Sequence, residues 1–254
     1  MSEFSSGTLA FEGWPFDREL LPQPSFLVGG AVRDALLGRR VEHLDLDFVI
    51  SQEAVATARE IARRYGAGFV ILDADRQIAR VVFERATLDF AEMEGDSLYE
   101  DIHRRDFTIN AIAYNPFTEE FIDPLDGRED LQRRIIRMVS AANLEDDPLR
   151  LLRGYRQSAQ LGFTISPETL LTIRKLAPLL TGVAVERVRS ELGYLLNAPG
   201  GMSWIERAWE DGLLVRWFLI AGDRFTVARN IDTAAAMLTE NWSELGSELS
   251  AWVR

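Results

Sequence analysis

The stretch FLVGGAVRDALLGRRVEHLDLDFVI (residues 26–50) decides the fold of the amino-terminal part of the chain. Its first apolar run ends in two glycines, and Gly38 stands where glycine commonly ends a helix. Acidic and apolar residues alternate in LDLDFVI, so Asp45 and Asp47 are predicted to point to the same face of a strand. The expected elements are a strand at 25–30, a helix at 31–38 and a strand at 44–50.

The two glycines and the residues around them favour phosphate chemistry. Gly29 and Gly30 let the backbone approach an anion closely, and the helix that follows offers unpaired N–H groups there. Arg33, in the first turn, can add a charge-assisted fork to the same phosphate. Asp45 and Asp47 are two hard oxygen donors that can hold Mg²⁺ beside water and substrate phosphates. The D-x-D pattern alone favours the polar face of an edge strand, but the glycine turn and Arg33 that precede it favour the metal-binding interpretation.

The remaining chain changes its period at about residue 107. Before that point, Ser51 is expected to cap a helix, and apolar runs predict strands; after it, a period of 3.6 predicts helices. Strands followed by helices indicate an α+β part and then an all-helical part. The expected elements are a helix at 52–65, strands at 68–73, 79–83 and 86–91, and helices near 107–114, 147–161, 167–177, 185–196, 202–213 and 225–239. The expected domains are an arm at 1–24, a head at 25–146 and a helical part at 147–254.

Composition excludes several classes of protein. The chain has 254 residues, 47% hydrophobic and 27% charged, which is typical of globular domains. It has no apolar run of about 18 residues and no secretory pattern at its start, which predicts a cytoplasmic protein without a membrane segment. The absence of Cys excludes disulfides and thiolate sites, and two His exclude a multi-His zinc site. The net charge of -12 argues against coating nucleic acid with the whole surface.

Five stretches together resemble the class II tRNA nucleotidyltransferase and bacterial poly(A) polymerase family, which belongs to the superfamily of DNA polymerase β. The first is GGAVRDALLGR followed by DLDFVI, and the second is RRDFTINAIAYNP. The others resemble the third, the nucleotide-selecting and the last, helix-stabilising signatures of the family. They occur in the family's order within residues 25–196: 29–39 with 45–50, 104–116, DPLDGREDLQRRIIR at 123–137, DDPLRLLRGYRQSAQLGF at 146–163 and ERVRSEL at 186–192.

The resemblance implies a polymerase-β-like head with a mixed sheet, a helical neck, and the start of a body that helps to grip tRNA. Asp45 and Asp47 would be the catalytic carboxylates that bind Mg²⁺. Gly30, Arg33 and Arg105 would meet the phosphates of the nucleotide. The ordinary alternative for RRDFTINAIAY is a helix start at which Asp106 caps the chain.

The segment 147–156 has its own spacing. Asp147, Arg150, Arg153 and Arg156 recur at three-residue steps and would be neighbours on a helix, where a solvated, salt-bridged face is the ordinary interpretation. The resemblance implies that Asp147 and Arg150 pair with the base of the incoming nucleotide, while Arg153 and Arg156 are phosphate-binding or structural. A carboxylate accepts from the amino group that C and A share, and a guanidinium donates to ring acceptors. Asp146 stands where the family usually has Glu.

Two departures from the family refine the expected reaction. Only residues 90–103 lie between Asp89 and Arg104, whereas CCA- and A-adding members have a longer loop there; the short connection favours CC addition. The chain also ends before a full body and tail, which would normally supply most of the tRNA-gripping surface. Asp89 is open between a third active-site carboxylate and a hairpin-edge residue. His43 and His103 are expected to be ordinary surface or packing residues.

The predicted function is a tRNA nucleotidyltransferase. It would add CMP from CTP to the tRNA 3′ end by two-metal chemistry with Mg²⁺. The expected product is CC, and CCA, which also needs ATP, is the open alternative. A poly(A) polymerase shares the same motifs. A catalytically idle RNA- or nucleotide-binding relic is the alternative from another class, although such a relic has no need to keep metal ligands. The sequence leaves the oligomeric state open.

Overall fold

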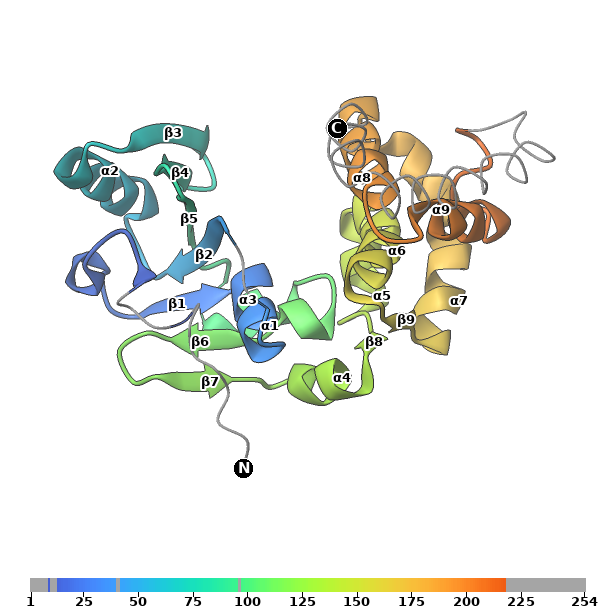
Figure 1. Cartoon of the computed structure of the whole chain (residues 1–254), viewed down its shortest axis with the longest axis horizontal. Helices are drawn as coiled ribbons and strands as arrows, with labels where there is room; N and C mark the ends of the chain where they lie inside the picture. Colours follow the sequence, from blue (N-terminus) through green and yellow to red (C-terminus); the bar gives the residue numbers. More distant parts are fainter. Residues whose placement is uncertain (1–8, 10–12, 40–41, 96, 218–254) are drawn as a thin grey trace, which may run out of the picture. The chain divides into compact units, whose positions relative to one another are not determined.

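The computed structural model describes residues 9, 13–39, 42–95 and 97–217 (Figure 1). The chain divides into two compact units, Met1–Arg133 and Arg134–Arg254. We call them the amino-terminal unit and the carboxy-terminal unit and describe each by itself.

A seven-stranded mixed sheet forms the centre of the amino-terminal unit, in the order β3-β4-β5-β2-β1-β6-β7 (Figure 1). β2 and β5 pair in parallel, and the other neighbours pair antiparallel. The α+β fold with a mixed sheet is therefore confirmed. The strands are β1 (Ser25–Val28), β2 (Leu44–Ile50), β3 (Gly68–Asp73), β4 (Ile78–Val82), β5 (Ala86–Glu92), β6 (Ala113–Asn115) and β7 (Glu120–Ile122).

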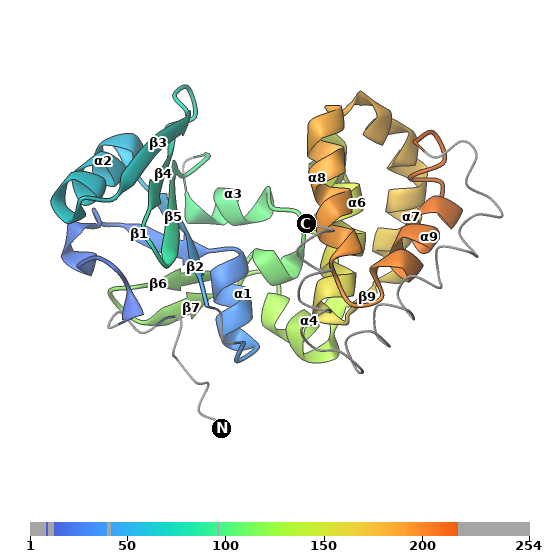
Figure 2. The same ribbon diagram turned by 45° about the horizontal axis from the view of Figure 1, so that its top comes forward.

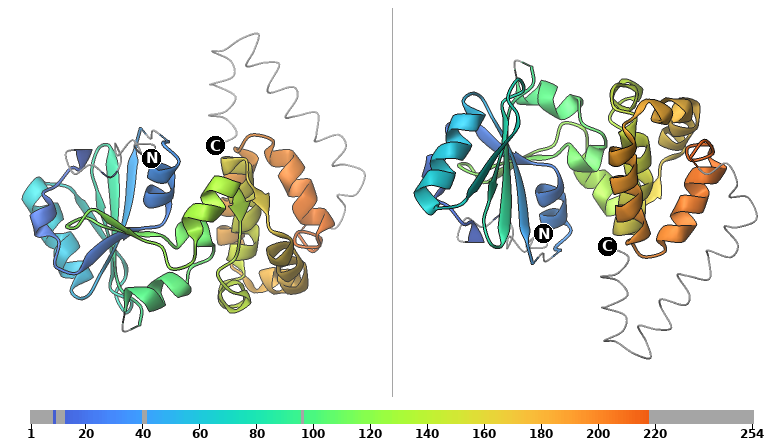
Figure 3. Two further views of the ribbon diagram at one scale, coloured as in Figure 1. Left: turned by 90° about the horizontal axis from the view of Figure 1, so that it is seen from below. Right: turned by 90° about the horizontal axis from the view of Figure 1, so that it is seen from above.

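Alternation along the central strands separates a core face from an open face. Leu46 and Phe48 of β2 are 1% exposed, whereas Asp45 and Asp47, which alternate with them along the strand, keep contact with solvent. The Phe48 ring stacks on Phe90 of β5 with centroids 5.2 Å apart. Helix α2 (Ala54–Tyr65) covers part of the sheet by packing on β3, β4 and β5 (Figure 3). The sheet thus buries its apolar residues and leaves both aspartates on one accessible side.

The described part of this unit also contains the α-helices α1, α3 and α4 and a short 3₁₀ helix, η2 (Arg18–Leu20). Helix α1 (Gly30–Leu36) packs on β1 and β2, as its place between those strands predicts. Helix α3 (Leu98–His103) follows β5 after the short connection 93–97, and Ser97 caps it through a hydrogen bond from the Glu100 backbone N–H. Helix α4 (Gly127–Arg133) packs on a 3₁₀ turn, η3 (Thr108–Asn110).

The helix expected near 107–114 is wrong. The segment forms the tight turn η3 and then enters the sheet as β6, where Ala113 pairs with Val28 and Tyr114 with Leu27. Ile109 and Ala111 are fully buried, so the apolar spacing reflects burial on all sides rather than one helical face.

The cap expected at Ser51 is also wrong. Helix α2 begins at Ala54, and Glu53 stands at its N-cap with a positive φ of 61°. The Glu53 backbone N–H donates to the carboxylate of Glu92 at 2.7 Å. Glu92 thus accepts from a backbone N–H at the start of the helix, as the Ser51 hydroxyl was expected to do.

The carboxy-terminal unit is mainly helical. Helix α6 packs against α8 and α9, and a short parallel pair, β8 with β9, lies beside α6, so the unit is not all-helical (Figure 2). Its elements are β8 (Ile135–Ile136), α5 (Ala141–Asp146), α6 (Leu149–Leu161), β9 (Thr164–Ile165), α7 (Pro167–Leu176), the 3₁₀ helix η4 (Ala177–Gly182), α8 (Val185–Leu196) and α9 (Gly201–Glu210).

The expected helices of this unit are present where the structure describes the chain. Those near 147–161, 167–177, 185–196 and 202–213 correspond to α6, α7, α8 and α9, while the one near 225–239 lies outside the described residues. The chain divides between Arg133 and Arg134, before the domain boundary predicted at 146/147, and the pairing of β8 with β9 keeps residues 135–136 within the carboxy-terminal unit. Within the described part of the chain, no helix has the length and apolar character needed to span a bilayer.

Candidate active site

The sheet register brings a carboxylate to the glycine turn. Asp47 of β2 pairs with Val28, the last residue of β1, and Gly29 follows directly. Gly29 has a φ of +75°, which favours glycine, and a Cβ built there would lie 3.1 Å from Asp47 Oδ2 and 3.9 Å from Arg105 Nη1. The Asp47 carboxylate and the Arg105 guanidinium thus both lie close to the turn. Three parts of the chain, from the first and second signatures, meet at this point.

Asp45 and Asp47 share one face of β2, as predicted. The side chain of Asp45 is 78% exposed, and its Oδ1 lies 3.7 Å from His43 Nε2, which also contacts the Thr87 hydroxyl at 2.8 Å. Asp89 of β5 stands directly beside Asp47 in the parallel pairing. This proximity was left open by the sequence, because strand order is not written in the local pattern.

Two side chains hold the Arg33 guanidinium beside the glycine turn: the carboxamide of Asn110 and the carboxylate of Asp34. Its Nη1 donates to Asn110 Oδ1 at 2.8 Å, and its Nε and Nη2 each donate to Asp34 at 3.0 Å. A Cβ at Gly30 would lie 3.6 Å from Arg33 Nη2, so the guanidinium lies close to that glycine. The predicted phosphate-binding pair, Gly30 and Arg33, is therefore brought together.

The second signature supplies the support for Arg33. Asn110 donates through Nδ2 to Asp106 Oδ1 at 2.9 Å, and the same oxygen accepts from the Phe107 backbone N–H at 2.8 Å. Asp106 therefore closes the η3 turn rather than capping an α-helix. Both side chains are buried, so their hydrogen bonds fix the donor and acceptor positions firmly.

A buried carboxylate that sequence reasoning missed orients Arg105. Asp101 is fully buried and accepts from Arg105 Nη2 at 2.7 Å and from Arg104 Nη2 at 2.9 Å. Burial acts to raise the pKa of Asp101, but the charges and hydrogen bonds of Arg105 and Arg104 outweigh it, and the pKa lies below its usual value. The spacing of Asp101 from both arginines, three and four residues on a helix, was the signal available in the sequence.

Residues of the third signature form helix α4 and pack it against the η3 turn of the second signature. Asp123 accepts from the backbone N–H groups of Gly127 and Arg128 at 2.8 and 2.9 Å and so caps α4. A Cβ on Gly127 would collide with the backbone oxygen of Thr108, and the Thr108 hydroxyl donates to buried Asp130 at 2.7 Å. These contacts give Asp123, Gly127 and Asp130 of DPLDGRED structural roles.

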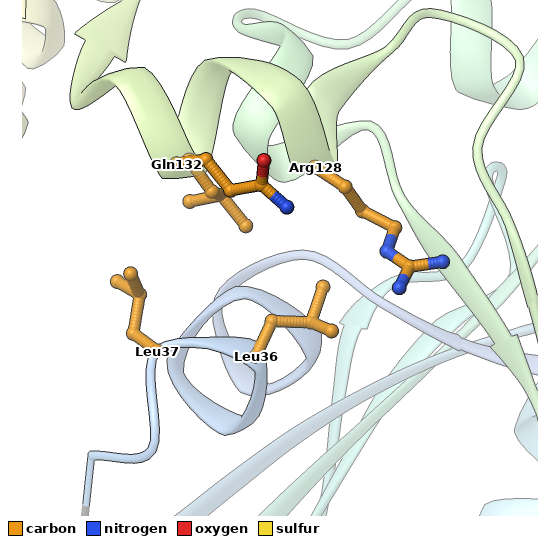
Figure 4. Close-up of a pocket in the computed structure, with 5 residues that line it drawn as sticks. Leu36, Leu37, Arg128 and Gln132 are labelled. Atoms are coloured by element: carbon orange, nitrogen blue, oxygen red, sulfur yellow. The ribbon is translucent and has the colours of Figure 1, made fainter. Parts of the chain in front are cut away.

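A small pocket opens where α4 meets α1. It has a volume of about 80 Å³ and is lined by Leu36, Leu37, Arg128, Leu131 and Gln132. Figure 4 shows Leu36 of α1 and Leu37, directly after it, facing Gln132 and Arg128 of α4. Its apolar lining and small volume suit packing between the helices rather than a nucleotide.

The donor set on β2 fits a magnesium ion. Asp45 and Asp47 offer hard carboxylate oxygens on one accessible face, and Mg²⁺ in nucleotide-binding sites commonly takes one or two carboxylates with water and phosphate oxygens. Among the described residues, no group of three or more His, Asp or Glu side chains is arranged to hold an ion. Asp45 and Asp47 therefore have the oxygen-ligand chemistry that suits Mg²⁺.

In the carboxy-terminal unit, Asp147 lies outside the helix on which the spacing had placed it. It adopts an extended conformation between α5 and α6. Its Oδ2 accepts from Arg187 Nη2 at 3.0 Å, while Arg150 Nη1 donates to the backbone oxygen of Asn143 at 3.0 Å. Asp147 and Arg187 line a cleft of about 440 Å³ together with residues of η4.

Arg153 and Arg156 continue from Arg150 along α6, and all three are half-buried. Arg156 donates through Nε to Glu191 of α8 at 2.6 Å and through Nη1 to Gln160 at 2.9 Å. Glu191 belongs to the last signature, so this contact ties α6 to α8 and gives Arg156 a structural role. Arg150, Arg153 and Arg156 all lie on one helix, α6, as their three-residue spacing predicts.

Comparison with known families gives two matches. Residues 25–137 match the family described as "Poly A polymerase head domain", and residues 162–220 match "Probable RNA and SrmB- binding site of polymerase A". The first match contains the glycine turn, both aspartates of β2 and the second signature.

Curated relatives and solved structures agree with these matches. The chain is 59% identical over 204 residues to a CC-adding tRNA nucleotidyltransferase of Synechocystis sp., covering 80% of this chain and 49% of the relative. It is 42% identical over 183 residues to an A-adding tRNA nucleotidyltransferase of Deinococcus radiodurans, covering 70% and 41%. The chain therefore spans about half the length of the curated relatives it matches.

A solved structure is similar over most of the chain. It is described as a tRNA nucleotidyltransferase complexed with a primer tRNA and an incoming ATP analog, with a TM-score of 0.75 and 28% sequence identity. The similarity covers 87% of this chain and 67% of that one.

Proposed function

Because this chain belongs to the family defined by the poly(A) polymerase head domain, we propose that it transfers nucleotides to the 3′ end of tRNA, with CTP as its main substrate. The observation that supports this most directly is the meeting of Asp47, the Gly29 turn and Arg105 on one side of the sheet. That arrangement combines a cation-binding carboxylate with a backbone and a guanidinium suited to phosphate.

In the proposed reaction, the terminal 3′ hydroxyl of tRNA attacks the α-phosphorus of the nucleotide in line, and pyrophosphate leaves. Asp45 and Asp47 would hold Mg²⁺, which, when bound, lowers the pKa of the hydroxyl and offsets the charge of the departing oxygen. Arg33 and Arg105 orient the triphosphate. Asn110 and Asp101 hold these two guanidinium groups in place, so little ordering is left for the moment of binding.

Base selection is proposed to lie with Asp147 and Arg150. The Asp147 carboxylate can accept from the exocyclic amino group of C or A, and the Arg150 guanidinium can donate to ring acceptors. Uracil presents a carbonyl where cytosine presents an amino group, and the carboxylate would repel it. Arg153 is proposed to meet phosphate, while Arg156 is held by Glu191.

CC addition is the preferred outcome among the family's reactions. Two observations support it: the connection between β5 and α3 spans only residues 93–97, and the Synechocystis relative is named a CC-adding enzyme. A poly(A) polymerase or an idle nucleotide-binding chain would share the fold. Action on tRNA would place the protein in the cytoplasm, with tRNA and CTP as its partners.

Single-nucleotide extension tests the proposal. The full chain is incubated with Mg²⁺ and either CTP or ATP on tRNA that lacks CCA, ends in C, or ends in CC. Two additions of C followed by a stop are expected. Addition of A after CC would assign CCA synthesis, long A tracts would assign a poly(A) polymerase, and nucleotide binding without any extension would contradict the proposed activity.

An Asp47→Asn variant provides the matched test of mechanism. The change keeps the shape of the side chain and removes its charge, so extension should fall by about a hundredfold or more. Asp75→Asn, an exposed aspartate in the turn between β3 and β4, is the control and should extend normally. Near wild-type extension by Asp47→Asn would exclude this metal-dependent mechanism.

A further inference from the structure

Arg80 completes a row of charged side chains across three strands. Asp47 of β2 pairs with Asp89 of β5 in the parallel register, and Asp89 pairs with Arg80 of β4 in the antiparallel register. Paired residues on neighbouring strands point to the same face of a sheet. The row Asp47, Asp89 and Arg80 therefore lies on the open face that also carries Asp45.

Arg80 forms a bidentate ion pair with the carboxylate of Asp89. Its Nε donates to Oδ1 and its Nη2 to Oδ2, each at 2.7 Å. A two-bond fork fixes the position and the plane of the carboxylate, which a single contact does not. Both side chains keep partial exposure, 42% and 26%, so solvent weakens what this ion pair contributes to the stability of the fold. The fork is therefore better explained by what it does to the neighbouring carboxylates.

The neighbouring carboxylates create an electrostatic problem. Asp45, Asp47 and Asp89 stand on one face of adjacent strands, and their negative charges repel one another. The fork to Asp89 raises the pKa of Arg80, and the charges of Asp45 and Asp47 raise it further. The guanidinium thus lies within the electrostatic field of all three aspartates.

We propose that Arg80 is a positioning residue for the metal-binding carboxylates: it holds Asp89 by both oxygens and sets the net charge that a divalent cation meets at Asp45 and Asp47. Asp89 is thereby a fixed neighbour of Asp47 with its charge compensated by Arg80. The inference rests on the proposed function in taking Asp45 and Asp47 as the residues that bind the cation.

Two substitutions separate the charge of Arg80 from its fork. Arg80→Gln removes the positive charge, and we expect the Mn²⁺ dissociation constant of the full chain to fall about three- to tenfold. Arg80→Lys keeps the charge and loses the two-bond geometry, so Mn²⁺ binding should stay within about twofold of wild type. In both variants kcat for C addition should fall about tenfold, because the carboxylate beside Asp47 is no longer held.

Mn²⁺ binding is measured by electron paramagnetic resonance, without nucleotide or tRNA, and extension is measured separately. Arg63→Gln is the matched control: Arg63 makes a similar fork to Glu60, at 2.8 and 2.7 Å, on the exposed side of α2. Neither Mn²⁺ binding nor kcat should change in this control. The Arg80→Gln effect on binding should also disappear when Asp47→Asn is added, which places the measured ion at β2. Melting temperatures show that each variant is folded.

Three results would overturn the inference. Arg80→Gln could bind Mn²⁺ more weakly than wild type, Arg80→Lys could turn over at the wild-type rate, or the wild-type chain could lack a Mn²⁺ site that depends on Asp47. If wild type binds Mn²⁺ as expected but extends no RNA, the proposed function fails, and the Mn²⁺ titrations of the Arg80 variants still decide the role of Arg80.

Discussion

Arg33 Nη1 lies 2.8 Å from Asn110 Oδ1, although 77 positions separate the two residues in the chain. Arg33 lies in α1 and Asn110 is the last residue of the η3 turn, so the contact joins the first and second signatures. Asn110 is itself held by Asp106. The orientation of a guanidinium beside the glycine turn thus depends on a buried amide from a distant segment.

Replacing Asn110 should therefore affect nucleotide binding before it affects the chemistry. Asn110→Ala removes the acceptor of Arg33, and we expect KM for CTP to rise about tenfold with a smaller fall in kcat. The lost buried hydrogen bonds should cost about 1–3 kcal/mol of unfolding free energy. Steady-state kinetics and denaturant unfolding measure the two effects, with the exposed Asn197→Ala as control. An unchanged KM would show that Asn110 does not position Arg33.

Gly29 and Gly38 offer a matched pair of substitutions. Both have a positive φ, +75° and +66°, so alanine should cost about 1–2 kcal/mol of stability at either position. At Gly29 the added Cβ would approach Asp47 Oδ2 at 3.1 Å, whereas at Gly38 no atom of the described residues lies within 4 Å of it. We expect extension to fall at least tenfold in Gly29→Ala and to stay near wild type in Gly38→Ala. Equal activity in the two variants would contradict the assigned site.

Asp101 should make stability depend on acidic pH. Its folded-state pKa is lowered, so its contribution to stability is fully present above the ordinary carboxyl value of about 4 and is lost as the pH falls below it. Asp101→Asn should cost about 2–3 kcal/mol of unfolding free energy at pH 7. Denaturant unfolding of both proteins from pH 7 to pH 3 should show the difference shrinking at the acidic end. A difference that stays constant with pH would rule out this ionised pair.

The proposed base contact at Asp147 predicts a change in nucleotide preference. Asp147→Ala should reduce the preference for CTP over UTP by about ten- to a hundredfold, because the acceptor for the amino group is lost. Glu168→Gln, an exposed glutamate in the first turn of α7, is the control and should keep the preference. The ratio of kcat/KM for the two nucleotides is the measurement. A preserved ratio in Asp147→Ala would place base selection elsewhere.

Local patterns predicted the elements that depend on neighbours in the chain. The apolar run of β1, the glycines after it and the alternation of β2 each follow from a few adjacent residues, and the helices α6 to α9 follow from their period. The error at 107–114 has a clear cause: a short segment buried on every side shows no distinguishing period. Only pairing with Leu27 and Val28 makes Tyr114 and Ala113 part of a strand.

By itself, the sequence determined the glycine turn, the shared face of Asp45 and Asp47, and the order of the signatures, because these depend on spacing along one segment. Tertiary structure decided which distant residues join them: Asn110 at Arg33, Asp89 beside Asp47, and Arg80 beyond it. Strand order and the partners of buried polar groups depend on segments that are far apart in the chain. No local pattern encodes them, and they become determined only when the sheet and its connections are assembled.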